Sequence, residues 1–179
     1  VVGNPPWVVS AVLPGDEVLY YHDTYLKSGD LYAYFIERML GLHKGRFSFV
    51  CPRFFMFNRA LEYLRKDIIE NFTIDSLVDA GRAFPEVQSE CMIFVFEYRS
   101  PKDPYVIRNE RWNNSGQLLS QSHIQSDLFK KTPNFMFNVL LPVNWLTITE
   151  KLKGSSIFLG KLCKSKRGLE LGRGALVKN

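Results

Sequence analysis

One stretch of the chain is apolar almost without interruption: CMIFVFEY, residues 91–98. A strand with this pattern belongs in the middle of a sheet, or in a sheet covered on both faces, because neither of its sides suits water. Shorter apolar runs predict further strands. These runs are VVG at 1–3, RFSFVC at 46–51 and TIDSLVDA at 73–80.

Two segments between these runs have the periodicity of amphipathic helices. The first follows Asp30, a candidate N-cap, and reads LYAYFIERMLGL; the second spans residues 59–71. On the first helix the expected inward residues are Leu31, Phe35, Met39 and Leu42. On the second they are Leu61, Leu64, Ile68 and Ile69, and the expected outward residues are Glu62, Arg65, Lys66 and Glu70. Residues 10–29, with Pro, Gly, Asp and Ser at intervals, predict a loop.

The alternation of strands and helices predicts an α/β fold with a mostly parallel sheet covered by helices. Only residues 82–90 separate the runs 73–80 and 91–98, so we expect the last strand to be antiparallel to its neighbour. After Ser100 the breaker cluster SPKDP marks a boundary near residue 101. Beyond it the sequence predicts an edge strand at 105–112, irregular structure at 113–135 and partial helix at 140–152.

Composition excludes several classes of protein. The 179 residues include three cysteines, none in C-x-x-C spacing, which argues against a disulfide framework or a zinc site and favours a reducing cytoplasm. His22, His43 and His123 are scattered without ligand spacing, so no metal is predicted. No apolar run approaches the length of a membrane span, and no signal segment is present. The net charge of +5 is mild and suits a polyanionic partner.

The turn Asn4-Pro5-Pro6-Trp7 follows the first apolar run. Two prolines fix two φ angles and remove two backbone donors, which leaves carbonyl oxygens free to accept hydrogen bonds. Asn4 adds a side-chain carbonyl, and Trp7 supplies a flat face for stacking. Two hydrogen-bond acceptors beside a flat aromatic face suit the binding of a planar group that carries an amino substituent. The alternative is a stiff connecting turn with a buried Trp.

Four blocks in order decide between these readings: VVGNPPW, DLYAYFIERML, GRFSFVCPRFF and LVDAGRAFPEVQSECMIFVFE. Over about residues 1–98 the chain resembles adenine-specific amino-group DNA methyltransferases of restriction–modification systems, whose catalytic motif is Asn-Pro-Pro-aromatic. The resemblance implies a partial Rossmann-like sheet and S-adenosylmethionine as methyl donor. It implies that Asn4 and the Pro5 carbonyl accept the two amino hydrogens of an adenine flipped out of the duplex. Trp7, where most members have Tyr, and Phe84 would contact that base.

Under this resemblance the chain has three regions. Residues 1–100 are the C-terminal half of a catalytic domain, 101–153 are a linker and edge region, and 154–179 begin a target-recognition domain. The glycine-containing cofactor loop of the family would precede Val1, which leaves Asn4 as the candidate cofactor contact. The sequence is therefore expected to be a fragment that is inactive alone. Cys51 ends an apolar strand and is expected to be a core residue rather than a nucleophile.

The predicted partners are double-stranded DNA and a restriction or specificity subunit. Basic residues near the C-terminus are candidates for contacts to the DNA backbone. They are Lys164, Lys166, Arg167 and Arg173. Two alternatives stay open: an RNA or protein-glutamine methyltransferase with the same motif, and a DNA-binding subunit that has lost catalysis. The aromatic residues Phe54, Phe55 and Phe57 are expected to pack in the core or at the entry of the following helix.

Overall fold

The computed structural model divides the chain into two compact units, residues 1–143 and 144–179, which are described separately. The structure describes residues 1–8, 12–24, 29–42, 44–85, 87, 89–102, 104–137, 144–157 and 159–164. His43, Lys166, Arg167 and Arg173 lie outside these residues. The division into catalytic, linker and recognition regions stays a prediction.

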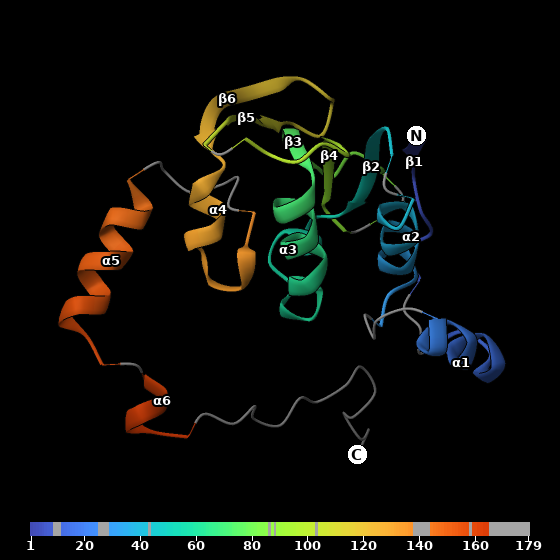
Figure 1. Cartoon of the computed structure of the whole chain (residues 1–179), viewed down its shortest axis with the longest axis horizontal. Coiled ribbons are helices and arrows are strands. Elements are labelled where there is room, and N and C mark those ends of the chain that lie inside the picture. The colour runs from blue at the N-terminus through green and yellow to red at the C-terminus, as the bar shows by residue number, and fades with distance from the viewer. Residues whose placement is uncertain are drawn as a thin grey trace, which may run out of the picture. The chain divides into compact units, whose positions relative to one another are not determined.

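The first unit is built on one six-stranded sheet (Figure 1) with the order β1-β2-β4-β3-β5-β6. The strands are β1 (Val2–Gly3), β2 (Arg46–Pro52), β3 (Thr73–Gly81), β4 (Cys91–Glu97), β5 (Val106–Trp112) and β6 (Leu118–Gln125). The pairs β1–β2 and β3–β5 are parallel, whereas β2–β4, β3–β4 and β5–β6 are antiparallel.

The sheet is therefore mixed. Strands β1, β2, β3 and β5 share one direction, in keeping with the expected parallel character, but three of the five pairings are antiparallel. The antiparallel arrangement predicted for β3 and β4 is confirmed. An α/β fold follows from these strands and the helices on one of their faces.

Helices α1 (Gly15–Thr24) and α4 (Asp127–Lys131) and strand β6 lie where the sequence predicted a loop or irregular structure. Helix α1 occupies part of the expected loop at 10–29, and its first turn carries Asp16 and Glu17, which suit the positive end of a helix dipole. Strand β6 lies within the expected irregular region 113–135. It is exposed along almost its whole length, so it carries none of the apolar alternation by which a strand is recognised. Because β6 pairs with β5, the strand predicted at the edge, 105–112, lies inside the sheet and not at its edge.

The remaining helices of the first unit are α2 (Leu31–Leu40), α3 (Glu62–Asn71) and α4 (Asp127–Lys131), with 3₁₀ turns η2 (Arg53–Met56), η3 (Arg59–Leu61) and η4 (Pro133–Phe135). The second unit holds α5 (Trp145–Ser155) and α6 (Leu159–Leu162). Helix α2 confirms the predicted helix but not its inward face. Phe35 is 45% exposed and Leu42 39%, because the buried side follows the spacing of Tyr32, Ile36 and Leu40 instead.

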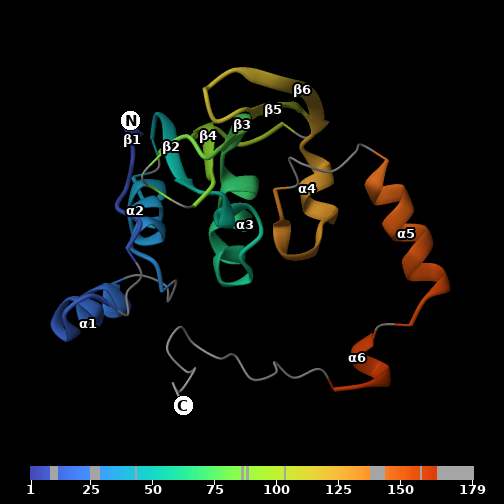
Figure 2. The same ribbon diagram turned by 180° about the vertical axis from the view of Figure 1, so that it is seen from behind.

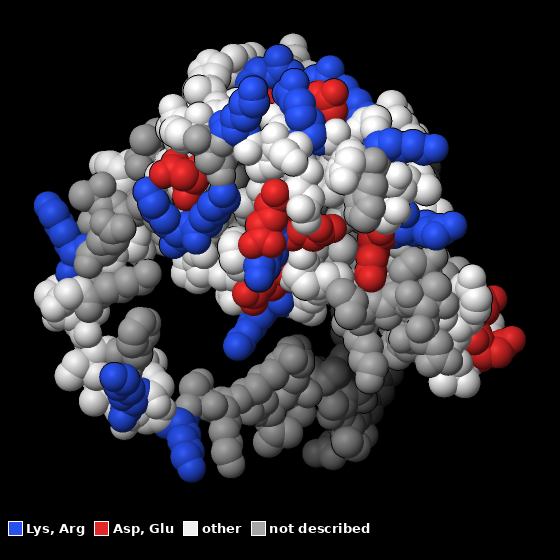
Figure 3. Space-filling view, viewed as in Figure 1, with Lys and Arg blue, Asp and Glu red and all other residues white. Residues whose placement is uncertain are grey.

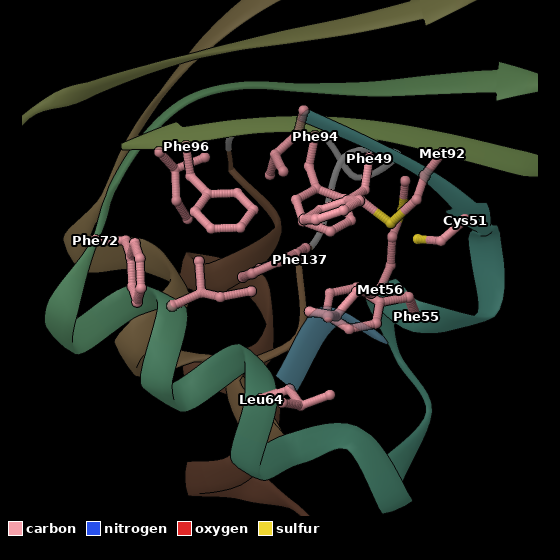
Figure 4. Close-up of a cluster of buried hydrophobic side chains, with 14 of the residues drawn as sticks. Phe49, Cys51, Phe55, Met56, Leu64, Phe72, Met92, Phe94, Phe96 and Phe137 are labelled. Carbon is pink, nitrogen blue, oxygen red and sulfur yellow. The ribbon is translucent and has the colours of Figure 1, made fainter. Parts of the chain in front are cut away.

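Helices α2, α3 and α4 lie on the same side of the sheet in both views (Figures 1 and 2). The face that they cover is rich in phenylalanine (Figure 4): Phe49, Phe94 and Phe96 lie between the strands and the helices, with Phe72 of the α3 end and Phe137 beyond η4. The Phe55 and Phe94 rings stack with centroids 5.3 Å apart. This cluster, here called the helix-side core, also contains Cys51, which is fully buried, as expected.

Arg65 of α3 was expected on the outward side, but it is fully buried. Its guanidinium donates hydrogen bonds to four backbone carbonyls, those of Phe55 and Asn58 at 2.8 Å each, Asn134 at 2.8 Å and Phe135 at 3.2 Å. Burial lowers the pKa of Arg65 to about 10, opposed by Glu62 and Tyr32, so the group stays protonated at neutral pH. Helical periodicity did not reveal the burial of Arg65, because the carbonyls that accept its hydrogen bonds lie outside α3, up to 70 residues away.

Candidate functional site

The turn at residues 4–7 leaves the carboxyl end of β1 at an edge of the sheet. Gly3 fits closely over Phe49, since a Cβ at Gly3 would lie 3.1 Å from that ring. Pro5 is buried and Asn4 is exposed. The Val8 carbonyl then accepts a hydrogen bond of 2.8 Å from the Leu31 N–H, which joins the end of the turn to the start of α2. The turn is thus fixed on both sides.

The strands β1, β2 and β3 point the same way, so the turn after β1 and the loop after β3 meet at one edge. That loop, residues 82–90, is here called the Phe84 loop. The rings of Trp7 and Phe84 lie edge to face, with centroids 5.9 Å apart and planes 77° apart. Both rings line a pocket of about 530 Å³, here called the edge pocket. Its lining residues are Asn4, Pro5, Pro6, Trp7, Phe84, Pro85 and Val87.

The structure thus brings together all five residues predicted for catalysis and base binding, which are Asn4, Pro5, Pro6, Trp7 and Phe84. None of the described residues that line the edge pocket is titratable. The pocket offers carbonyl acceptors and aromatic faces, so it suits the holding and orienting of a planar, amino-bearing group better than general acid–base chemistry. The Trp7 Nε1 is buried and finds no acceptor among the described residues.

The entry of the Phe84 loop is held by two side chains that sequence reasoning missed. Gly81 adopts φ +58°, a conformation that suits glycine, and its N–H donates to Asp79 Oδ1 at 3.2 Å. The next N–H, that of Arg82, donates to Asn114 Oδ1 at 3.0 Å. Asn114 lies in the turn between β5 and β6, and 32 residues separate it from Arg82, so no local motif could have marked it.

The exit of the Phe84 loop is held by Arg53, at the end of β2. The Arg53 N–H donates to the Glu90 carbonyl at 2.8 Å. Its guanidinium forms ion pairs with the Glu90 carboxylate and, at 3.3 Å, with the buried Asp79. The carboxylate of Asp79 therefore links both ends of the loop.

A smaller hydrophobic cluster lies beneath the edge pocket, on the face of the sheet opposite the helix-side core. Here it is called the pocket-side cluster. Its residues alternate along the strands with those of the helix-side core, as the two-residue period of a strand requires. They are Val78, Ala80 and Cys91, with Trp7, Val50, Phe84, Ile93 and Trp112 packed against them.

A second hollow of about 450 Å³ shares Trp7 and Val87 with the edge pocket. Phe54 and Phe57 line it and are 61% and 42% exposed, so neither packs in the core, which was one of the two expected placements, whereas Phe55 is buried. These two rings point away from the core because η2 places only Phe55 and Met56 inward. Burial raises the pKa of the Tyr32 phenol, which also lines this hollow.

Burial raises the pKa of both the Cys51 and the Cys91 thiol, which keeps them uncharged. No group of His, Cys, Asp and Glu side chains among the described residues is arranged to hold a metal ion. Within the same residues, no helix is long and apolar enough to cross a membrane.

The basic residues divide between the two units. Lys164 is exposed after α6, and the other three predicted backbone contacts lie outside the described residues. Figure 3 shows Lys and Arg side chains gathered over the β5–β6 part of the sheet, where Arg108 and Arg111 are exposed. The sequence analysis did not single out these two.

Comparisons with known proteins find similar restriction–modification methylases. Residues 1–84 match the model of the Eco57I restriction-modification methylase family. The chain is 31% identical over 116 residues to the type II methyltransferase M.BstVI of Geobacillus stearothermophilus, a match that covers 60% of this chain and 20% of that protein. The chain thus spans about a fifth of the length of this curated relative.

Solved structures share the fold. A chain from a study of complex assembly and conformational transition in the type I R-M system matches with a TM-score of 0.58 and 16% identity, over 90% of this chain and 43% of that one. A modification subunit of a putative type I restriction enzyme from Vibrio vulnificus YJ016 matches with a TM-score of 0.50 and 13% identity, over 87% and 31%. Residues 1–84, which hold the turn and the Phe84 position, are thus similar to the Eco57I restriction-modification methylase family.

Proposed function

We propose that the edge pocket holds an adenine flipped out of double-stranded DNA, and that the protein transfers a methyl group to its exocyclic amino nitrogen within a restriction–modification system. One observation carries this proposal: the Asn4–Trp7 turn and Phe84, from segments almost 80 residues apart, line the same pocket. The likeness to the methylase family supports it. In this role the protein works in the cytoplasm, with a restriction or specificity subunit as a further partner.

The chain's own residues supply positioning. The adenine amino nitrogen is a poor nucleophile because its lone pair is delocalised into the ring. If Asn4 Oδ1 and the Pro5 carbonyl accept its two hydrogens, the nitrogen becomes pyramidal and its lone pair faces the methyl donor. Since transfer is then a direct displacement, holding the reactants in line provides much of the rate.

The two aromatic rings have different tasks in this arrangement. They lie 77° apart, so a base that stacks flat on Trp7 stands nearly perpendicular to Phe84. Trp7 therefore provides the stacking face, and Phe84 closes the pocket from the side. Their centroids are 5.9 Å apart, so the two rings are in contact and hold each other at this angle before the base arrives.

S-Adenosylmethionine supplies the methyl group when bound. Among the described residues, Asn4 is the candidate for a contact near that methyl group, because it is the exposed polar side chain of the edge pocket. No metal is part of the proposal. Lys164, Lys166, Arg167 and Arg173 are proposed to contact the DNA backbone.

Asn4→Ala tests the proposal in the full-length protein that carries this sequence. Loss of one preorganised hydrogen-bonding group at the reacting centre is expected to lower the rate of methyl transfer to adenine by roughly 100-fold or more. The dissociation constant for DNA should change little, because Asn4 contacts the flipped base alone. Asn71→Ala, which removes an exposed amide bonded to Asp67, is the matched control. Unchanged methylation by the Asn4→Ala protein, or transfer to RNA or to a glutamine peptide in place of DNA, would refute the proposal.

Trp7→Ala tests the stacking face separately. It is expected to weaken the hold on the flipped base by ~1–3 kcal/mol, the usual contribution of one stacked base. Fluorescence of 2-aminopurine at the target position measures this directly, because the base brightens when it leaves the duplex. Trp7→Phe keeps a flat ring and should retain most of the signal. Equal signals from all three proteins would show that Trp7 does not stack on the base.

A further inference from the structure

We propose that Asn114 is a positioning residue that sets the place of Phe84, so that the turn between β5 and β6 shapes one wall of the base pocket. This inference rests on the proposed function. It assigns a role to a segment that lies beyond residues 1–84, the part of the chain that matches the methylase family.

The first step of the argument is the contact itself. Asn114 Oδ1 accepts a hydrogen bond of 3.0 Å from the Arg82 N–H, two residues before Phe84. A Cβ added at Gly81 would lie only 2.9 Å from that oxygen. The Asn114 oxygen therefore sits directly over the backbone at the point where the loop leaves β3. Arg82 and the following residue are exposed, so the loop has little packing of its own there.

The second step is the rigidity of the turn that presents Asn114. Asn113 Oδ1 accepts hydrogen bonds of 2.9 Å from the N–H groups of both Ser115 and Gln117. Its Nδ2 donates to Gln117 Oε1 at 2.9 Å, and its N–H donates to the Gln117 carbonyl at 2.8 Å. Gly116 closes the turn with φ +75°. A turn held by this many internal bonds can act as a fixed support.

The third step is the way in which the turn is fixed to the pocket. Strand β5 pairs in parallel with β3, and its residue Arg111 lies opposite Asp79, so both strands end at the same edge of the sheet. Trp112 packs in the pocket-side cluster together with Phe84 and Trp7. Its Nε1 donates to Glu110 Oε2 at 2.9 Å, which fixes the ring. Phe84 and Trp112, which precedes the turn that carries Asn114, thus pack against the same cluster.

A double-mutant cycle tests this role in the full-length protein, with 2-aminopurine fluorescence as the measure of base flipping. Asn114→Ala is expected to reduce the equilibrium for flipping roughly three- to tenfold, the usual effect of one lost hydrogen bond. Asn114→Asp keeps an acceptor and should restore it, while Ser115→Ala is the control within the same turn. In a Phe84→Ala background, Asn114→Ala should have almost no further effect, because Asn114 acts through Phe84.

A second measurement separates this inference from the proposed function. Hydrogen exchange at the Arg82 amide is expected to be faster in the Asn114→Ala protein and unchanged in Asn114→Asp, with or without DNA. If exchange rises as expected but the wild-type protein does not methylate adenine, the proposed function fails and the support of the loop stands. If exchange at Arg82 does not change, or if the effects of the Asn114 and Phe84 substitutions simply add, Asn114 does not position Phe84.

Discussion

The two faces of the sheet differ in what fills them. On one face, large side chains such as Phe47, Phe94 and Phe96 pack fully buried beneath the helices. On the other, the buried members of the pocket-side cluster are Val78, Ala80 and Cys91, and the large rings around them are half-buried. Burial of apolar area is the main source of stability, so the helix-side core stabilises the fold. The pocket-side cluster places rings at a surface where a ligand can reach them.

Two adjacent residues of β4 provide the most direct test of whether the two faces contribute differently to stability. Phe94→Ala is expected to lower the free energy of unfolding by ~3–5 kcal/mol, because it leaves a cavity in the helix-side core. Ile93→Ala, one position along and on the other face, should cost roughly 1 kcal/mol, since its side chain is half-buried. Chemical denaturation of both proteins measures the difference. Similar losses in the free energy of unfolding would mean that the two faces contribute equally to stability.

Arg65 tests whether the helix-side core also depends on a polar contact. Arg65→Met should keep much of the packing but leave four backbone carbonyls without their donor, at a cost of about 3 kcal/mol in the free energy of unfolding. Lys66→Met, at the exposed neighbouring position, should change stability by less than about 0.5 kcal/mol. A stable Arg65→Met protein would show that packing alone holds the segment around η4.

Two glycines with positive φ, Gly81 and Gly116, separate the effect of backbone strain on stability from its effect on the pocket. Gly81→Ala and Gly116→Ala should each cost roughly 1 kcal/mol from backbone strain. Only at Gly81 does the new Cβ approach Asn114 Oδ1, at 2.9 Å, whereas the space around Gly116 is open. The two variants should therefore have similar thermal unfolding midpoints, whereas only Gly81→Ala should lower the equilibrium for base flipping. Equal base flipping in the two variants would argue against a role for the exact position of the Phe84 loop.

The cysteines give the smallest expected effect. Cys163 is exposed and should react first with a thiol reagent in the native protein. Cys91 lies in the pocket-side cluster near the exit of the Phe84 loop, and Cys51 lies in the helix-side core. Since local opening of a loop requires less free energy than opening of a core, Cys91 should be labelled before Cys51. Mass spectrometry of the labelled peptides gives the order, and the reverse order would contradict the comparison.

The sequence predicted the parts of this molecule that depend on local pattern. The strands β2, β3 and β4 and the helices α2 and α3 lie where periodicity placed them. The four residues 4–7 predicted a stiff turn, and the ordered blocks around them were needed to predict that this turn and Phe84 would contact the same base. Local pattern was sufficient there because prolines and uninterrupted apolar runs restrict the backbone directly.

The features that sequence reasoning missed depend on contacts between distant segments. Periodicity placed Arg65 outward, because nothing in α3 shows that carbonyls near residue 135 will surround it. Strand β6 is polar and was recognised only through its pairing with β5. Asn114 and Arg53 hold the Phe84 loop from elements that are neighbours in the sheet and not in the sequence. Such roles become visible only when the strand order is known.

The carbonyl contacts of Arg65 also limit how modular the molecule can be. Restriction–modification enzymes that exchange their recognition segments require a junction that leaves the fold on either side complete. Asn134 and Phe135, both with positive φ, receive hydrogen bonds from Arg65, and Phe137 packs in the helix-side core. A recombination point before Asn134 would replace the segment that supplies two of the four carbonyl acceptors of the buried Arg65, so viable chimaeras should join beyond Phe137.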